Sequence, residues 1–166
     1  GLSPEMTYHF AIFEYNGSGF TTEYLTTSFE TGTQATLGPP TTQVSAVVIS
    51  NVTGNSMQIS WTNGDGNGRL VLMKEASAVD ANPVDLAAYS ATTSFGNGTQ
   101  IGTGNYVVYR SSGNIVTVTN LQPGTTYHVA VFEYNGSGNS SAYLTPGAIS
   151  NATTGTTPTQ ATTNLQ

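Results

Sequence analysis

The stretch LQPGTTYHVAVFEYNGSG runs from Leu121 to Gly138, and a second copy, LSPEMTYHFAIFEYNGSG, runs from Leu2 to Gly19. Thirteen of the eighteen aligned positions are identical, at a spacing of 121 − 2 = 119 residues. Two of the five differences exchange one apolar residue for another, as with Phe10 and Val129. An internal repeat decides how a chain divides into units. This one predicts a whole unit preceded by the tail of another, and it names no reaction.

The repeated stretch has the alternation of a β-strand. Tyr127, Val129 and Val131 lie on one face of the predicted strand, and the residues between them lie on the other. We assign these three residues to the structural core of the complete unit. Trp61 and Leu121 are assigned to the same core.

A corner precedes this strand and a turn follows it. Pro123 and the Gly after it predict a turn between Leu121 and Tyr127. A Tyr six residues after such a Leu can direct its hydroxyl back to upstream backbone, which is the tyrosine corner of immunoglobulin-like sandwiches. The pair Asn135-Gly136 predicts a tight hairpin turn. Together these signals predict an all-β antiparallel sandwich.

Composition excludes two classes of partner. Charged residues make up 7% of the chain, against roughly 25% in ordinary soluble domains. The three cations, Arg69, Lys74 and Arg110, stand against nine carboxylates and leave a net charge of -6. We therefore expect neither nucleic acid nor an anionic membrane as a partner.

Several absent features narrow the chemistry and the location. The chain contains no Cys, so disulfides and thiolate metal sites are excluded. No apolar run approaches the ~18 residues that suggest a membrane span. No signal peptide is visible at Gly1, and the chain begins within a repeat, so we expect its true start elsewhere. The Thr-rich, Lys-poor composition is typical of a secreted, extracellular or cell-surface protein.

The repeat and the composition divide the chain into four segments. Residues 1–31 predict the C-terminal hairpin of a preceding repeat, which by itself is marginal in water. Residues 32–43 (GTQATLGPPTTQ) predict a linker that its two prolines make partly extended. Residues 44–153 hold the complete repeat. Residues 154–166 hold a second linker and the start of the next repeat.

Within the complete repeat, one predicted strand is apolar on both faces. Residues 69–75 include four consecutive apolar side chains, so another part of the chain must cover each face. The strand pattern then lapses from Ala76 to Gly104, where Pro83–Tyr89 predicts one helical turn with Asn82 as its cap. The remaining strands are predicted at 44–49, 57–62, 106–110, 115–119 and 143–153.

The order of these signals resembles a fibronectin type III domain. Trp61 stands where that family keeps its second-strand Trp, and a Gly-rich loop follows. The run from Val116 through Leu121, Pro123 and Tyr127 is similar to the fifth strand, the corner and the sixth strand of the family. The 119-residue unit is longer than the family usually is, and the excess falls as an insertion between the third and later strands, from Ala76 to Asn105.

A narrower resemblance accounts for this insertion. The pieces FGNGT at 95–99, GNYVVY at 104–109 and FEYNG at 132–136 are similar to the long fibronectin-type repeats of very large secreted surface proteins. Those proteins belong to gliding bacteria and their relatives and use the type IX secretion route. The resemblance implies a surface-exposed, tandemly repeated stalk or adhesin, and it carries no catalytic residues.

No constellation in the sequence supports catalysis, a cofactor or a metal. His128 recurs as His9, but no second ligand lies near it in the sequence, which favours a structural role. Glu133 recurs as Glu14 among aromatic residues, where a raised pKa is conceivable. Glycosidase chemistry needs a second carboxylate several ångströms away. The candidates for this second carboxylate are Asp65, Asp80 and Asp85. They lie in separate loops and belong to no common motif, and they also lack the Asp spacing of a calcium-binding loop.

Phe132 and Tyr134 form a candidate interaction face opposite the core set. Exposed aromatic side chains there could stack on sugars or on a partner protein. The favoured alternative is that the insertion folds over this face, because its own apolar residues need burial. Those residues are Val79, Leu86, Tyr89 and Phe95.

These observations predict a structural and adhesive repeat of a large extracellular fibre or stalk. Its expected partners are neighbouring repeats, end to end, and surface glycans or other cell-surface proteins. The alternative is a carbohydrate-binding or spacer module attached to a secreted enzyme. Residues 1–31 cannot bury their apolar face alone, so the chain is either a window of a longer polypeptide or a subunit completed by strand donation. We favour the longer polypeptide, because residues 31–43 already join two repeats.

Overall fold

A computed structural model describes residues 2–155, which form two separate units. The division falls between Gly1–Gly38, here called unit 1, and Pro39–Gln166, here called unit 2. The predicted start of a further repeat after residue 155 lies outside the described residues. No helix among residues 2–155 has the length and apolar character needed to cross a membrane.

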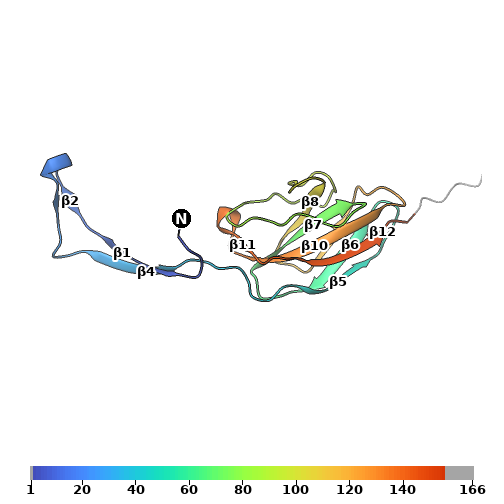
Figure 1. Ribbon diagram of the computed structural model, residues 1–166, viewed down its shortest axis with the longest axis horizontal. Helices are drawn as coiled ribbons and strands as arrows, with labels where there is room; N and C mark the ends of the chain where they lie inside the picture. Colours follow the sequence, from blue (N-terminus) through green and yellow to red (C-terminus); the bar gives the residue numbers. More distant parts are fainter. Residues whose placement is uncertain (1, 156–166) are drawn as a thin grey trace, which may run out of the picture. The chain divides into compact units, whose positions relative to one another are not determined.

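Unit 2 is a sandwich of two antiparallel sheets, which confirms the predicted fold class (Figure 1). Its described residues include one short 3-10 turn but no α-helix. The first sheet has the order β5 (Ser45–Ser50), β6 (Met57–Thr62) and β9 (Ile115–Val118). The second has the order β11 (Ala142–Tyr143), β10 (Thr126–Asn135), β7 (Gly68–Glu75) and β8 (Asn105–Ser111), and β12 (Ala148–Thr153) also pairs with β10.

β10 is the centre of the second sheet. Along one edge it pairs with β7, from Tyr127 opposite Glu75 to Tyr134 opposite Gly68. Along the other it pairs first with β12 and then with β11. The single strand predicted at 143–153 is therefore two strands, interrupted at residues 144–147.

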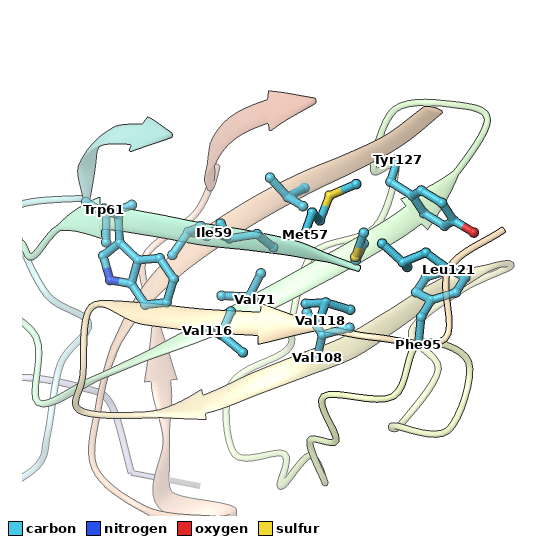
Figure 2. Close-up of a cluster of buried hydrophobic side chains, with 14 residues drawn as sticks. Met57, Ile59, Trp61, Val71, Phe95, Val108, Val116, Val118, Leu121 and Tyr127 are labelled. Carbon is cyan, nitrogen blue, oxygen red and sulfur yellow. The ribbon is translucent and has the colours of Figure 1, made fainter. Parts of the chain in front are cut away.

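The main core lies between the two sheets. All five residues assigned to it from the sequence are in the cluster of buried side chains. Figure 2 shows Trp61 at one end of this cluster and Phe95, Leu121 and Tyr127 together at the other. Phe95 comes from the insertion, and its ring meets the Tyr127 ring edge to face with centroids 5.0 Å apart. Each fully buried apolar side chain of this size contributes roughly 1.5–3 kcal/mol of transfer free energy.

The insertion at residues 76–104 covers the outer face of β7 and β10. A second buried cluster there includes Leu70 and Leu72 of β7. Val79, Tyr89 and Ile101 of the insertion pack against it. The double-sided burial expected for residues 69–75 is therefore present, and the insertion supplies the outer cover.

The helical turn predicted at Pro83–Tyr89 is wrong. No helix forms there, because the segment makes its hydrogen bonds to the β10–β11 region instead. The Leu86 N–H donates to the Ser141 carbonyl at 2.9 Å, and the Asp85 carboxylate accepts from the Tyr143 N–H at 2.8 Å. Leu86 also has a φ of 61°, which an α-helix does not allow.

The turn after β10 is longer than the Asn135-Gly136 pair predicts. Asn135 pairs with Ala142, so six residues connect the two strands. They include the 3-10 turn η2 (Gly138–Ser140), in which the Ser140 N–H donates to the Ser137 carbonyl. Gly136 still takes the positive φ of 85° that the pattern anticipates.

Unit 1 consists of two short antiparallel pairs. β1 (Thr7–Ile12) pairs with β4 (Glu30–Ala35) along its whole length, and β2 (Tyr15–Asn16) pairs with β3 (Glu23–Tyr24). Residues 32–35 are therefore strand, so the linker predicted at 32–43 is wrong at its start. Thr and Gly there resemble a linker in composition, but their backbone groups continue the ladder with β1.

The tyrosine corner forms in both units. The Gln122 N–H donates to the Tyr127 hydroxyl at 3.0 Å, and the Ser3 N–H donates to the Tyr8 hydroxyl at 2.8 Å. Burial raises the pKa of Tyr127, because ionisation would place a charge in the core. The repeated sequence thus produces the same local bond whether or not a core surrounds it.

A threonine ties the end of each unit to its corner. Thr154 donates its hydroxyl to the Gln122 carbonyl at 2.6 Å and accepts from the Thr125 N–H at 2.9 Å. Thr36 makes the same two bonds, to the Ser3 carbonyl and from the Met6 N–H. These threonines are 154 − 36 = 118 residues apart, against 119 for the repeated stretch. One extra residue in unit 1, in the loop before β4, accounts for the difference.

We predict that Tyr127→Phe destabilises unit 2 by about 1–2 kcal/mol, because the Gln122 N–H loses its partner in a partly buried site. Urea unfolding followed by fluorescence reports on this unit alone, since Trp61 is the only Trp and lies in its core. The matched control is Tyr8→Phe, which removes the equivalent bond from unit 1 and should leave the Trp61 transition in place. Equal shifts for both variants would contradict this account.

Candidate interaction surface

A buried ion pair joins β7 to β10 in unit 2. Arg69 and Glu133 are directly opposite in the strand register, and Arg69 Nε donates to Glu133 Oε1 at 2.8 Å. Their side chains are 5% and 0% exposed. A buried carboxylate is tolerated only with a counter-charge and hydrogen bonds to its remaining lone pairs. Nothing in the sequence around Glu133 indicates this partner, which lies 64 residues away.

The Gly-rich loop after β6 supplies the other hydrogen bonds to Glu133. The Gly64 N–H donates to Oε1 at 2.7 Å and the Gly66 N–H donates to Oε2 at 3.0 Å. Arg69 donates in return to the carbonyls of Gly66 and Ser112. A Cβ on Gly66 would lie 2.5 Å from Glu133 Oε2, so no larger residue fits without displacement. The ion pair therefore determines the path of this loop.

Gln43 attaches the first residues of unit 2 to the same region. Its Oε1 accepts from the N–H groups of Glu133 and Val44, at 2.8 and 3.1 Å. Its Nε2 donates to the carbonyls of Leu144 and Pro146, at 2.9 and 3.0 Å. One amide side chain thus bonds to four backbone groups in three segments.

Asp65 holds the two residues before Gln43. Its carboxylate accepts from the backbone N–H groups of Thr41 and Thr42, with the closest distances 3.1 and 2.8 Å, and from the Thr41 hydroxyl. These hydrogen bonds hold the pKa of Asp65 below its ordinary value of 3.8, and the bond from the Thr41 hydroxyl has the largest effect. Residues 41–43 are therefore bonded to the body of unit 2 and are not a free tether.

Unit 1 leaves exposed the side chains that unit 2 buries. Phe10 and Ile12 are 52% and 62% exposed, whereas Val129 and Val131 at the same repeat positions are 1% and 0% exposed. Glu14, at the position of Glu133, is also exposed. In unit 2 the cover comes from β7 and the opposite sheet, which have no counterpart among residues 2–38.

We call Phe10 and Ile12, at the positions of the main-core residues Val129 and Val131, the open face of unit 1. Five more large side chains of unit 1 are also exposed: Phe13, Tyr15, Tyr24, Leu25 and Phe29. Phe13 stacks on Phe29 with ring centroids 4.7 Å apart, and grooves of the surface run beside several of these residues. An apolar surface of this kind is typical of a site that another chain segment covers.

The interaction face predicted at Phe132 and Tyr134 is wrong, because both side chains are buried. They are 1% and 8% exposed. Tyr134 packs against Tyr143, and the Arg110 guanidinium lies 5.0 Å above its ring. Burial raises the pKa of Tyr134. Tyr89 of the insertion completes the cover, packing against Tyr143 at 5.8 Å.

The insertion does not place all four of its predicted apolar residues on that face. Val79 and Tyr89 pack there, as expected. Phe95 enters the main core instead, and Leu86 remains 72% exposed. The Phe95 N–H donates a hydrogen bond to the carbonyl of Thr119, the residue after β9, and this bond holds the Phe95 segment of the insertion at the end of that strand.

The candidate metal and acid–base residues do not come together. Asp65 holds Thr41 and Thr42, Asp80 pairs with Lys74 at 2.6 Å, and Asp85 accepts from Tyr143. His128 lies half-buried on β10, opposite Asn151 of β12. Within residues 2–155, no three His, Asp or Glu side chains are placed to share a metal ion.

The comparisons identify the family. The sequence profile of the fibronectin type III domain matches residues 38–146, so this chain belongs to the fibronectin type III family. Domains of this family are generally structural or adhesive modules of extracellular proteins and typically do not catalyse reactions. No curated protein matches the chain.

Solved structures are similar to this chain at low sequence identity. The FN1–FN3 domains of chicken CNTN1 are 16% identical, with a TM-score of 0.54 over 93% of this chain and 44% of that one. The FN3 domain of human collagen XX is 19% identical, with a TM-score of 0.44 over 73% of this chain and 100% of that one. Domains d3–d4 of rat CD45 are 16% identical, with a TM-score of 0.44 over 93% of this chain and 66% of that one.

We predict that Glu133→Gln destabilises unit 2 by about 3–5 kcal/mol, because it leaves the Arg69 charge buried without its partner. The change retains size and shape, so the loss reports on charge. Glu14→Gln makes the same substitution at the equivalent exposed position of unit 1 and should leave the Trp61 unfolding transition unchanged. A loss below about 1 kcal/mol for Glu133→Gln would contradict the assigned role.

The lowered pKa of Asp65 predicts a pH dependence. A carboxyl group whose pKa is lower in the folded state stabilises that state above its unfolded pKa, and this contribution is lost as pH falls through the folded pKa. We expect Asp65→Asn to reduce the slope of unfolding free energy against pH below about pH 4. Thr41→Val should reduce the slope in part, because it removes one donor. Identical slopes in all three proteins would exclude this contribution.

Proposed function

We propose that this chain is part of a structural and adhesive fibre or stalk on a cell surface, built from tandem copies of the unit seen here. The observation that carries the proposal is the shared design of the two units. In each unit the repeated stretch forms the same tyrosine corner and the same hydrogen bonds to a threonine. Each unit also has the same main-chain bond: the Leu25 N–H donates to the Glu14 carbonyl, and the Leu144 N–H donates to the Glu133 carbonyl, both at 2.9 Å. Unit 1 thus has the local structure of the last strands of a complete repeat.

The attachment of residues 41–43 supports a load-bearing role. Gln43 and Asp65 bond the beginning of unit 2 to its body, and Thr154 bonds its end to the corner. A module that joins its neighbours end to end needs its two ends held to the core rather than left as free tethers. The few charges and the Thr-rich composition suit an exported protein. By the sequence resemblance, we propose that export uses the type IX secretion route.

The carbohydrate-binding alternative loses its main support in unit 2. It depends on an aromatic face at Phe132 and Tyr134, and these residues are buried under the insertion. A glycan array with the full chain tests it. Saturable binding that survives removal of the exposed Tyr15 and Tyr24 rings would return support to this alternative.

The tandem arrangement is tested on native material. We expect the polypeptide that carries these residues to be many times larger than 17.2 kDa under denaturing conditions, because the open face of unit 1 calls for preceding strands of the same chain. An antibody against unit 2 should label intact cells. A dominant species near 17.2 kDa would instead favour subunits that complete one another by strand donation.

A further inference from the structure

The one Lys of the chain lies in a cluster that the proposed function does not use. Lys74 ends β7 and is directly opposite Asn105, the first residue of β8, in the strand register. Opposite residues of an antiparallel pair have Cα atoms about 4.5–5.5 Å apart. The Lys74 side chain runs toward β8, with its Cε 3.7 Å from the place of a Cβ on Gly104.

Asp80 of the insertion bridges these two side chains. Lys74 Nζ donates to Asp80 Oδ2 at 2.6 Å, and Asn105 Nδ2 donates to Asp80 Oδ1 at 2.9 Å. The Asp80 backbone N–H donates in turn to Asn105 Oδ1 at 3.3 Å. One carboxylate therefore contacts the amine and the amide nitrogen, while its own backbone polarises the amide carbonyl.

We propose that Lys74 and Asn105 form an intramolecular isopeptide bond, with Asp80 as the proton-transferring group. Asn105 is fully buried and the Lys74 side chain is 14% exposed, and the Asp80 carboxylate contacts the amine and the amide from its two oxygens. The Asp80 carboxylate, 65% exposed, connects that site to solvent and gives the released ammonia a way out.

The proposed reaction is balanced without an oxidant or a cofactor. Asp80 takes a proton from the Lys74 ammonium, and the free Nζ lone pair attacks Asn105 Cγ. The oxyanion forms on Oδ1, where the Asp80 N–H already donates. The Cγ–Nδ2 bond then breaks, and Asp80 returns the proton to the leaving nitrogen. An ammonium and a primary amide become a secondary amide and an ammonium ion.

The bond would close the insertion covalently. Its two ends, residues 74 and 105, flank the whole segment that covers the outer face of β7 and β10. A covalent link across a long loop restricts the unfolded chain, as a disulfide does. The chain has no Cys, so an amide is a cross-link that its composition allows.

Intact mass of the denatured full chain, after incubation at neutral pH, tests the proposal. We expect the wild-type chain to be lighter than its sequence by one ammonia, about 17 Da. Trypsin should then fail to cut after Lys74 and release residues 70–110 as one peptide, instead of 70–74 and 75–110. Lys74→Arg and Asp80→Asn should each show the full sequence mass.

Asp85→Asn is the matched control, because it changes a carboxylate of the same insertion that holds Tyr143 rather than Lys74. It should keep the mass loss. A wild-type chain at its full sequence mass would overturn the proposal and leave the cluster as an ion pair. Persistence of the loss in Lys74→Arg would also overturn it, because ammonia would then leave from an Asn elsewhere.

Discussion

Burial of the Glu133 carboxylate is the constraint on which much of unit 2 depends. A charge with no exposure needs a counter-ion and several donors, and it obtains them from β7 and from the loop after β6. The ion pair with Arg69 fixes the register of β7 against β10, and the hydrogen bonds from Gly64 and Gly66 hold the Gly-rich loop against β10. The neighbouring backbone N–H binds Gln43, so the start of the unit is attached at the same place.

The two units show what the surroundings add to a shared sequence. Corner, turn and strand form in both, because their hydrogen bonds join residues close in sequence or in the adjacent strand. Burial differs completely: Ile12 is 62% exposed and Val131 is fully buried. Local bonds therefore define the shape of the repeat, while its stability comes from the apolar surface that other strands cover.

The insertion makes this fibronectin type III domain longer than usual and changes its surface. Tyr89 and Val79 cover a sheet face that would otherwise present Phe132, and Phe95 reaches past the edge of β9 into the main core. The aromatic side chains near β10 thus serve packing rather than recognition. What remains exposed and apolar is concentrated on unit 1, which is the surface that the proposed neighbouring repeat would cover.

The sequence by itself determined the sandwich, most of its strands and the need to cover β7, because period-two alternation and corner chemistry are local patterns. It also identified the core positions, including Trp61 and Tyr127. Only the tertiary structure decided the pairing of Arg69 with Glu133 and the bonds of Gln43, which join residues 64 and 101 positions apart. No local pattern encodes such partners: they follow from the way the sheets and loops come together, and that arrangement also buried the predicted aromatic face.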